Sequence, residues 1–307
     1  MIDELIAAGR YEDALRLLKD SKDENHVYQK ILCLYSLKRY NEARVECEIL
    51  KEYAEKNYYD VIAIYVTILI EMDSLEEAKH VLEEELSMPY IPGKYEKIFN
   101  ETYDELLKRG RENSKSINIF DTISDEDLAA QLLSHSDKEI IFMLLDQLNQ
   151  RNIRRILPAL EEYLSDVSKP RIFKTIIIES LASQNVDQFF ILKDENEEIE
   201  INPCHTTPLM NQVFINKIYF MFENITMRKD ISFLEYCMDV LVSYAGNIYP
   251  NEVEDGKINL VACSIAIYVD SMMGSNNGYE EKLIQEYHLD EKEVNDFLLT
   301  LEKIMIL

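Results

Sequence analysis

The chain has 307 residues, of which 47% are apolar, and a formal net charge of −26. This apolar content is sufficient for folded cores and excludes a disordered chain, while the acidity argues against nucleic-acid binding, because affinity for phosphate backbones comes mainly from Lys and Arg. The 7 glycines form no G-x-G-x-x-G or P-loop pattern, which argues against a nucleotide-binding α/β enzyme.

Apolar residues spaced three and four apart predict a series of amphipathic helices in the first part of the chain. Their ranges are 2–8, 11–20, 24–37, 40–56, 58–72, 75–87 and 94–109. Three of the turns between these helices repeat one pattern, in which a turn residue is followed by an aromatic residue or leucine and then, three positions on, by an alanine. The three copies are Gly9-Arg10-Tyr11-Glu12-Asp13-Ala14, Lys38-Arg39-Tyr40-Asn41-Glu42-Ala43 and Asp73-Ser74-Leu75-Glu76-Glu77-Ala78. The alanines are 29 and 35 residues apart, a spacing typical of stacked helical hairpins with a period of about 34 residues.

These residues resemble the tetratricopeptide repeat (TPR) family over roughly residues 3 to 90. Ala14, Ala43 and Ala78 match the alanine of the second helix in each hairpin, whereas Lys38 and Asp73 stand where the family favours glycine. The resemblance implies an all-α fold, an α-α superhelix of TPR-like hairpins that leaves a concave surface for macromolecular ligands.

TPR proteins usually hold ligands in the groove lined by the first helix of each hairpin. The resemblance places the groove here at Asn25, Tyr28, Gln29, Leu32, Asp60, Ala63, Ile64 and Thr67. TPR domains that grip the terminal carboxylate of a peptide present Lys, Arg and Asn at these places. Only Asn25 does so in this chain, which disfavours that kind of ligand. The alternative is that Tyr28, Leu32 and Ile64 merely pack against the neighbouring helix.

The polar stretch 110–116 lacks apolar periodicity and predicts a linker between two domains. We therefore expect a TPR-like domain over 1–110, a linker over 111–123 and a second helical domain over 124–307. Ser124 and Ser136 each precede an acidic residue by three positions, the spacing of a capping box at the start of a helix.

After these two helix starts comes a pair of ranges, 153–166 and 170–182, that looks like one HEAT-type helical hairpin. Alternating apolar and polar residues then predict one small β-hairpin over 188–203. Further helices are expected near 208–227, 231–246, 257–273, 279–287 and 290–305. This order of features resembles an uncharacterised family of TPR-like proteins from Gram-positive bacteria and mycoplasmas, which implies an interaction protein and brings no catalytic residues.

One dense basic stretch interrupts the acidic second half of the chain, and its members are Arg151, Arg154, Arg155, Lys169, Arg171 and Lys174. These side chains can form a surface patch for an acidic protein segment or RNA. Equally, they can neutralise neighbouring carboxylates or lie near helix ends, where the helix dipole favours cations.

The adjacent Cys204 and His205 are the one pair that suggests chemistry, although no further metal ligand lies near them in the sequence. The five cysteines are odd in number and contain no C-x-x-C pair, which fits reduced thiols in a cytosol. The most apolar window, 258–274, is too short for a membrane span and contains Asp270.

We therefore expect a cytoplasmic adaptor or scaffold for protein–protein interaction, without catalysis, cofactor, metal or membrane segment, whose partner is a protein. The alternatives are an enzyme with a site between the two domains, with Cys204 and His205 at its rim, and binding of RNA or an acidic partner through 151–174.

Overall fold

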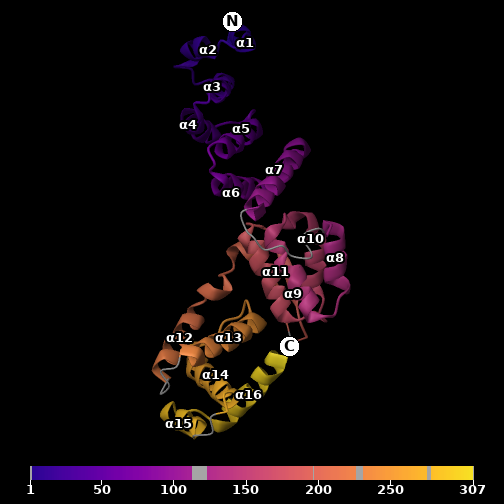
Figure 1. Ribbon diagram of the computed structural model, residues 1–307, viewed down its shortest axis with the longest axis vertical. Coiled ribbons are helices and arrows are strands. Elements are labelled where there is room, and N and C mark those ends of the chain that lie inside the picture. The colour runs from indigo at the N-terminus through magenta and orange to yellow at the C-terminus, as the bar shows by residue number, and fades with distance from the viewer. Residues whose placement is uncertain (1, 113–122, 196, 226–230, 275–277, 307) are drawn as a thin grey trace. The chain divides into compact units, whose positions relative to one another are not determined.

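The computed structural model describes residues 2–112, 123–195, 197–225, 231–274 and 278–306 (Figure 1). The chain divides into two compact units. Unit 1 comprises residues 1–118 and 150–152, and unit 2 comprises residues 119–149 and 153–307. Residues 113–122, which hold most of the linker predicted over 111–123, lie outside the described residues, so the predicted domain boundaries remain a prediction.

Unit 1 is built from helices that follow one another in chain order (Figure 1). They are α1 (Ile2–Ala7), α2 (Tyr11–Leu18), α3 (Glu24–Ser36), α4 (Tyr40–Lys51), α5 (Tyr58–Glu71), α6 (Leu75–Leu86) and α7 (Gly93–Glu112). Each helix contacts the next, and α5 also contacts both α3 and α7. The first helices of successive hairpins therefore form one continuous layer, as the sequence pattern predicts.

The hairpin turns have the same backbone geometry in all three copies. Gly9, Lys38 and Asp73 adopt left-handed φ angles of 72°, 57° and 59°. At each turn the next residue donates its backbone N–H to a carbonyl five residues back, with distances of 2.8 to 2.9 Å, which is the Schellman ending of a helix. The repeated alanines are fully buried, so the second helix of each hairpin approaches closely. The predicted helical-hairpin stack is confirmed.

Two helix ends in unit 1 differ from the prediction by three residues or more. Helix α4 stops at Lys51 instead of continuing to 56, because the carboxylate of Glu24 accepts hydrogen bonds from the backbone N–H groups of Lys56 and Asn57, at 2.9 and 2.6 Å. These donors are thereby satisfied outside the helix. Helix α7 continues through Gly110 to Glu112, into the start of the predicted linker.

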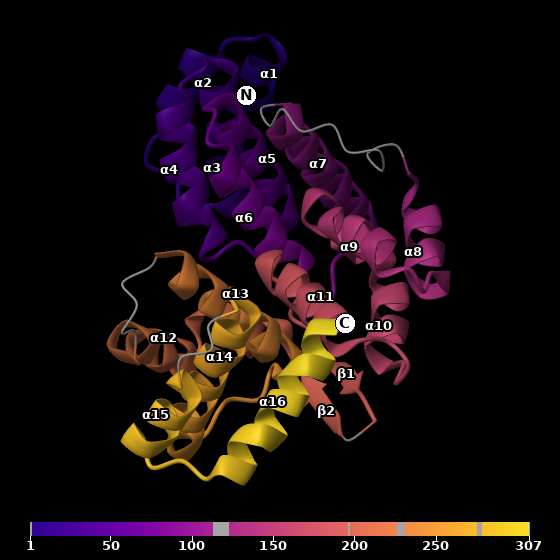
Figure 2. The same ribbon diagram turned by 60° about the horizontal axis from the view of Figure 1, so that its bottom comes forward.

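Unit 2 is also helical. Its helices are α8 (Asp125–Ser134), α9 (Lys138–Asp146), α10 (Leu157–Ser165), α11 (Arg171–Ser183), α12 (Val213–Ile225), α13 (Ile231–Ile248), α14 (Ile258–Met272), α15 (Tyr279–Glu286) and α16 (Glu291–Ile306). Helix α14 contacts α12, α13, α15 and α16 (Figure 2). Its small residues Ala262, Cys263 and Ala266 are completely buried, which lets these neighbours pack closely around it.

An antiparallel hairpin is formed by strands β1 (Phe190–Lys193) and β2 (Glu198–Ile201). Its register pairs Phe190 with Ile201 and Leu192 with Ile199, and β1 packs against α10. This confirms the β-hairpin expected within 188–203. An isolated hairpin is marginal in water, so packing on the helix stabilises it.

Of the two helix caps predicted in unit 2, Ser124 and Ser136, only the first caps its helix. The hydroxyl of Ser124 accepts from the backbone N–H of Asp127 at 3.0 Å and caps α8. The predicted Ser136 cap is wrong, because the carboxylate of Asp137 accepts from the N–H groups of Glu139 and Ile140 and caps α9 instead. Among the described residues, no helix combines the length and the apolar character needed to cross a membrane.

Candidate functional site

The predicted groove residues lie on α3 and α5, the two adjoining first helices. Asn25 is exposed, and the others, Tyr28, Gln29, Leu32, Asp60, Ala63, Ile64 and Thr67, are partly exposed. Tyr28 and Ile64 also pack against the buried core of unit 1. Both side chains therefore support the core with one part and present the rest to solvent.

Several polar groups of the groove are engaged within the chain. The side-chain amide of Gln29 donates to Asp3 at 2.6 Å, and that of Asn57 donates to Asn25 at 2.8 Å. The hydroxyl of Thr67 donates to the backbone carbonyl of Ala63 at 2.8 Å. The first two bonds tie α3 to α1 and to the start of α5, and the third lies within α5.

Asp60 lies at the centre of a cluster that spans three helices. Its hydrogen bond with the hydroxyl of Tyr95 on α7, followed by burial, raises the pKa of Tyr95 to about 12. Burial, followed by the charge of Asp60, also raises the pKa of Tyr28 on α3. Both phenols therefore remain protonated at neutral pH and offer donors to the Asp60 carboxylate or to a ligand.

Sequence reasoning missed the contribution of α7 to this face. Tyr95 is the third residue of α7, as Asp60 is of α5, so extending the repeat by one hairpin would have found it. The ring of Tyr95 stacks on Tyr59 with centroids 5.3 Å apart, and the ammonium of Lys94 lies 4.7 Å from its centroid. Tyr95 thus adds an aromatic surface beside Asp60.

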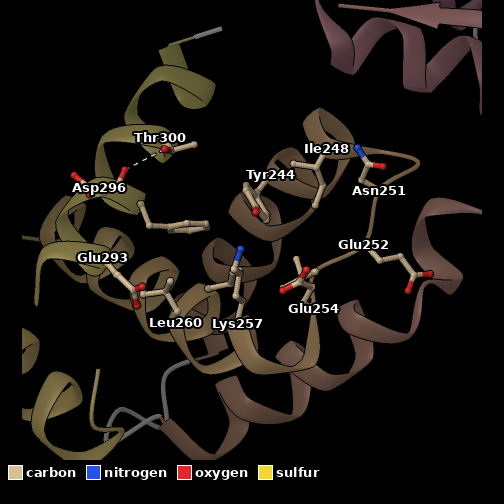
Figure 3. Close-up of a pocket in the computed structure, with 13 residues that line it drawn as sticks. Tyr244, Ile248, Asn251, Glu252, Glu254, Lys257, Leu260, Glu293, Asp296 and Thr300 are labelled. Carbon is tan, nitrogen blue, oxygen red and sulfur yellow. Dashed lines mark hydrogen bonds between the residues drawn. The ribbon is translucent and has the colours of Figure 1, made fainter. Parts of the chain in front are cut away.

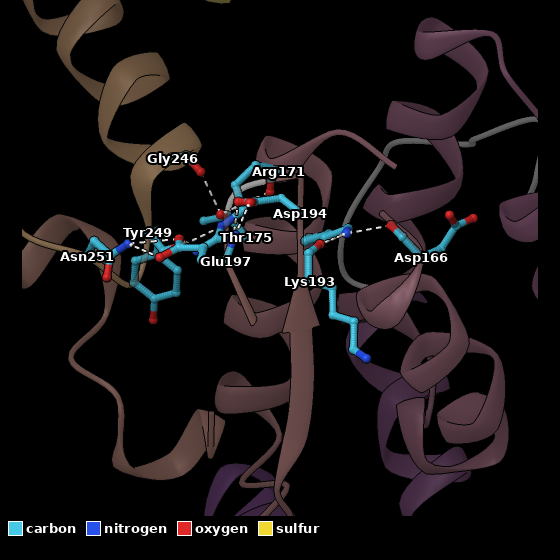
Figure 4. A network of polar contacts seen from close by, with 10 residues as sticks. Asp166, Arg171, Thr175, Lys193, Asp194, Glu197, Gly246, Tyr249 and Asn251 are labelled. Carbon is cyan, nitrogen blue, oxygen red and sulfur yellow. Dashed lines mark hydrogen bonds and ion pairs between the residues drawn. The ribbon is translucent and has the colours of Figure 1, made fainter. Parts of the chain in front are cut away.

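The basic stretch of unit 2 is partly internal. The guanidinium of Arg171 donates to Asp194 at 2.7 Å, to Glu197 at 2.9 Å and to the carbonyl of Tyr249 at 2.7 Å (Figure 4). The ammonium of Lys174 donates to the carbonyls of Asp166 and Lys193 (Figure 4).

Arg171 is 7% exposed and Lys174 is fully buried. Burial therefore removes both from the surface patch that the sequence suggested, and they instead join α11 to the β-hairpin and, through Arg171, to the end of α13.

Three other members of the stretch also have partners within unit 2, whereas Arg151 belongs to unit 1. Arg154 donates to the carbonyl of Gln184 at 2.7 Å, Arg155 lies 4.0 Å from Asp125, and Lys169 donates to the carbonyl of Leu133 at 2.6 Å. Arg151 is partly buried. These contacts agree with the alternative in which the basic residues neutralise and cap neighbouring groups.

The surroundings of Cys204 disfavour an activated thiol. Burial, followed by the charge of Asp187, raises the pKa of Cys204, and a raised pKa reduces the fraction of reactive thiolate. His205 lies 3.5 Å from Asp187. Within the described ranges, no group of three or more His, Cys, Asp or Glu residues has a metal-binding arrangement.

Helical hairpins in series, with a left-handed residue at each turn and a buried alanine behind it, define a TPR-like helical-repeat protein of the all-α class. No family model matches the chain. The chain is similar to the TPR repeat-containing protein YsoA of Bacillus subtilis (strain 168), with 26% identity over 209 residues that cover 65% of this chain. The matched region spans 60% of that relative's length. This similarity agrees with the expected resemblance to TPR-like proteins of Gram-positive bacteria.

Proposed function

We propose that the protein is a non-catalytic adaptor or scaffold that holds a segment of a partner protein on the face formed by α3, α5 and α7. The observation that carries this proposal is the cluster of Tyr28, Asp60 and Tyr95, which places two phenols and a carboxylate on α3, α5 and α7, every second helix of unit 1. Leu32 and Ile64 are partly exposed on the same helices and supply apolar contact area.

The combination suits recognition of a protein segment. Tyrosines bury a large apolar ring and offer a hydroxyl at little cost in side-chain entropy, and they are enriched among the residues that dominate binding energy. A rigid concave face of stacked hairpins presents such anchors along its length. The TPR repeats in the name of the relative support the same kind of role for this protein. We also propose that this protein is located in the cytoplasm.

The test is capture of partners from cytosol by the intact chain and by the double variant Tyr28→Ala with Ile64→Ala. If both are binding anchors, each truncation costs roughly 1–3 kcal/mol of binding energy, and capture falls sharply while the helical spectrum is retained. The matched control is Val45→Ala with Ile49→Ala, since both side chains are 50% exposed on α4 and lie outside the proposed face.

Two outcomes would contradict the proposal. Unfolding of the Tyr28 and Ile64 variant would mean that these side chains serve packing alone. A folded variant that captures the same proteins in the same amounts would place the function elsewhere.

A further inference from the structure

Unit 2 contains an open pocket that no sequence motif marked. It is about 520 Å³ in volume and lies between the end of α13, the segment 249–257, the first turn of α14 and one face of α16 (Figure 3). Cavities of about 300–1,000 Å³ are the usual size for ligand sites. The pocket therefore has room for one or two large side chains of a partner.

The floor of the pocket is apolar. The rings of Tyr244 on α13 and Phe297 on α16 meet edge to face, with centroids 5.0 Å apart. Val253 and Val261 are buried beneath the same surface, and Leu260 is partly exposed beside them. An apolar side chain placed here would remove further apolar surface from water, which favours binding.

The rim of the pocket is acidic and falls into two halves. Glu293 and Asp296 project from α16 on one side, and Glu252 and Glu254 project from the segment before α14 on the other, with the ammonium of Lys257 between them (Figure 3). All five side chains are exposed. Within the described part of the chain, none of the four carboxylates forms a salt bridge.

Four carboxylates face one ammonium, which leaves a formal charge of −3 around the mouth. Carboxylates grouped around a concave surface repel one another and attract cations, so complementary charge favours a basic partner and rejects an anionic one. Lys257 in the middle repels a cation at the centre and leaves the two acidic halves for cations on either side.

We propose that this pocket docks an extended segment of a partner protein in which an apolar side chain lies between Lys or Arg residues. The apolar side chain contacts the floor at Tyr244 and Phe297, and the flanking cations face Glu293 and Asp296 on one side and Glu252 and Glu254 on the other. This site belongs to unit 2 and does not depend on the face of α3, α5 and α7.

The probe is a set of fluorescent nine-residue peptides that carry Leu, Phe or Tyr between pairs of Arg in a Gly-Ser context. Binding to the full chain is measured by anisotropy at low and at physiological salt. We expect at least one of them to bind at least tenfold more tightly than its counterpart with Glu in place of Arg, and more tightly than its counterpart with a central Gly. Added salt should weaken binding, because exposed charges are screened over about 8 Å at physiological ionic strength.

The variant Glu254→Lys with Glu293→Lys reverses one charge on each side of the mouth and should weaken peptide binding about tenfold or more. The matched control, Glu280→Lys with Glu302→Lys, changes the net charge by the same amount at exposed positions outside the pocket lining. It should leave the affinity within about twofold, because exposed charges outside the site act weakly. The groove variant Tyr28→Ala with Ile64→Ala should bind the peptide normally, which separates this proposal from the proposed function.

Three results would overturn the proposal. In the first, no basic peptide binds more tightly than its acidic counterpart. In the second, the pocket and control variants lose affinity equally, which would mean nonspecific attraction to an acidic chain. In the third, the central-Gly peptide binds as tightly as the others and spermidine displaces them all at similar concentration, which would make the site a simple polycation site that does not use its apolar floor.

Discussion

The hydroxyl of Tyr58 on α5 donates a 2.7 Å hydrogen bond to the Oε1 atom of Glu85 on α6. Glu85 is only 1% exposed, and its Oε2 atom has no hydrogen-bond partner among the described residues. Burial therefore raises the pKa of Glu85 above its usual 4.5, although the bond from Tyr58 opposes the shift. A buried carboxylate in which one oxygen accepts no hydrogen bond destabilises the folded state whenever the group is ionised.

The variant Glu85→Gln should stabilise the protein at pH 7, because the amide keeps an acceptor for Tyr58 and carries no charge. For an acid whose pKa is raised in the folded state, the folded protein retains its proton longer, so stability falls as pH rises from 4.5 through the folded pKa. The gain is about 1.4 kcal/mol for each unit by which the pKa is raised. Thermal melts from pH 4 to pH 7 measure it.

The gain from Glu85→Gln should disappear at pH 4, where the native Glu85 is already protonated. Glu84→Gln is the matched control, since Glu84 is the preceding residue on α6 and its side chain is 49% exposed. It should change the melting temperature little at either pH. A gain for Glu85→Gln that persists at pH 4 would contradict the role of its charge.

Glycine at the second and third hairpin turns should stabilise the helical stack. Lys38 and Asp73 adopt left-handed φ angles, and neither side chain has a hydrogen bond or ion pair among the described residues. A left-handed backbone costs a residue other than glycine about 1–2 kcal/mol, and glycine removes this cost. Because glycine also has more freedom in the unfolded chain, each substitution should raise the free energy of unfolding by about 0.5–1 kcal/mol. Urea unfolding of Lys38→Gly and Asp73→Gly measures the gain.

The control for the glycine substitutions is Lys38→Ala, which keeps the left-handed cost and should be nearly neutral. Gly9→Ala should destabilise the protein through backbone strain alone, because Gly9 has a φ of 72° and an added Cβ would meet no atom within 4 Å. A lower urea midpoint for Lys38→Gly would contradict the argument.

The repeat pattern was readable from the sequence because its causes are local. A turn residue, an aromatic or leucine and an alanine within six positions determine each hairpin, and the alanines at 14, 43 and 78 are all buried as expected. The end of α4 could not be predicted from the local sequence, because it depends on Glu24. The carboxylate of Glu24 accepts from the N–H group of Lys56, 32 residues further along the chain. For Arg171 and Lys174 the sequence left open a surface patch or the neutralisation of neighbouring groups, because the partners that decide between them lie as far along the chain as Tyr249.

Lys174 should make stability rise with pH above neutrality. Burial, followed by the charge of Arg171, lowers its pKa from 10.5 to about 8. Below about pH 8 both folded and unfolded chains hold the proton, and the folded state bears the full cost of a buried charge. Between about 8 and 10.5 the folded state loses the proton first, so this residue contributes increasing stability as pH rises.

The variant Lys174→Met removes that titration, although it also leaves the carbonyls of Asp166 and Lys193 without this donor. Its stability relative to the parent should therefore decline as pH rises from 8 to 10.5, as measured by denaturant unfolding at matched pH values. Lys292→Met, at an exposed position of α16, should show a constant difference over the same range. A constant difference for Lys174→Met would exclude the lowered pKa.

The segment 110–118 should be the first site of proteolytic cleavage in the native chain. Its sequence is polar, with Ile117 as its one large apolar residue, and such sequences are preferred sites of proteolytic nicking, whereas the hairpins on one side and the helices of unit 2 on the other bury large apolar cores. Brief trypsin treatment should cut after Arg111 or Lys115 although 32 Lys and Arg residues are present, and mass spectrometry should find fragments near 1–115 and 116–307.

The variant Arg111→Gln with Lys115→Gln should resist trypsin for longer, while thermolysin should still cut it near Ile117 or Ile119. First cleavage within 24–87 would instead mean that the hairpin stack is not a stable unit.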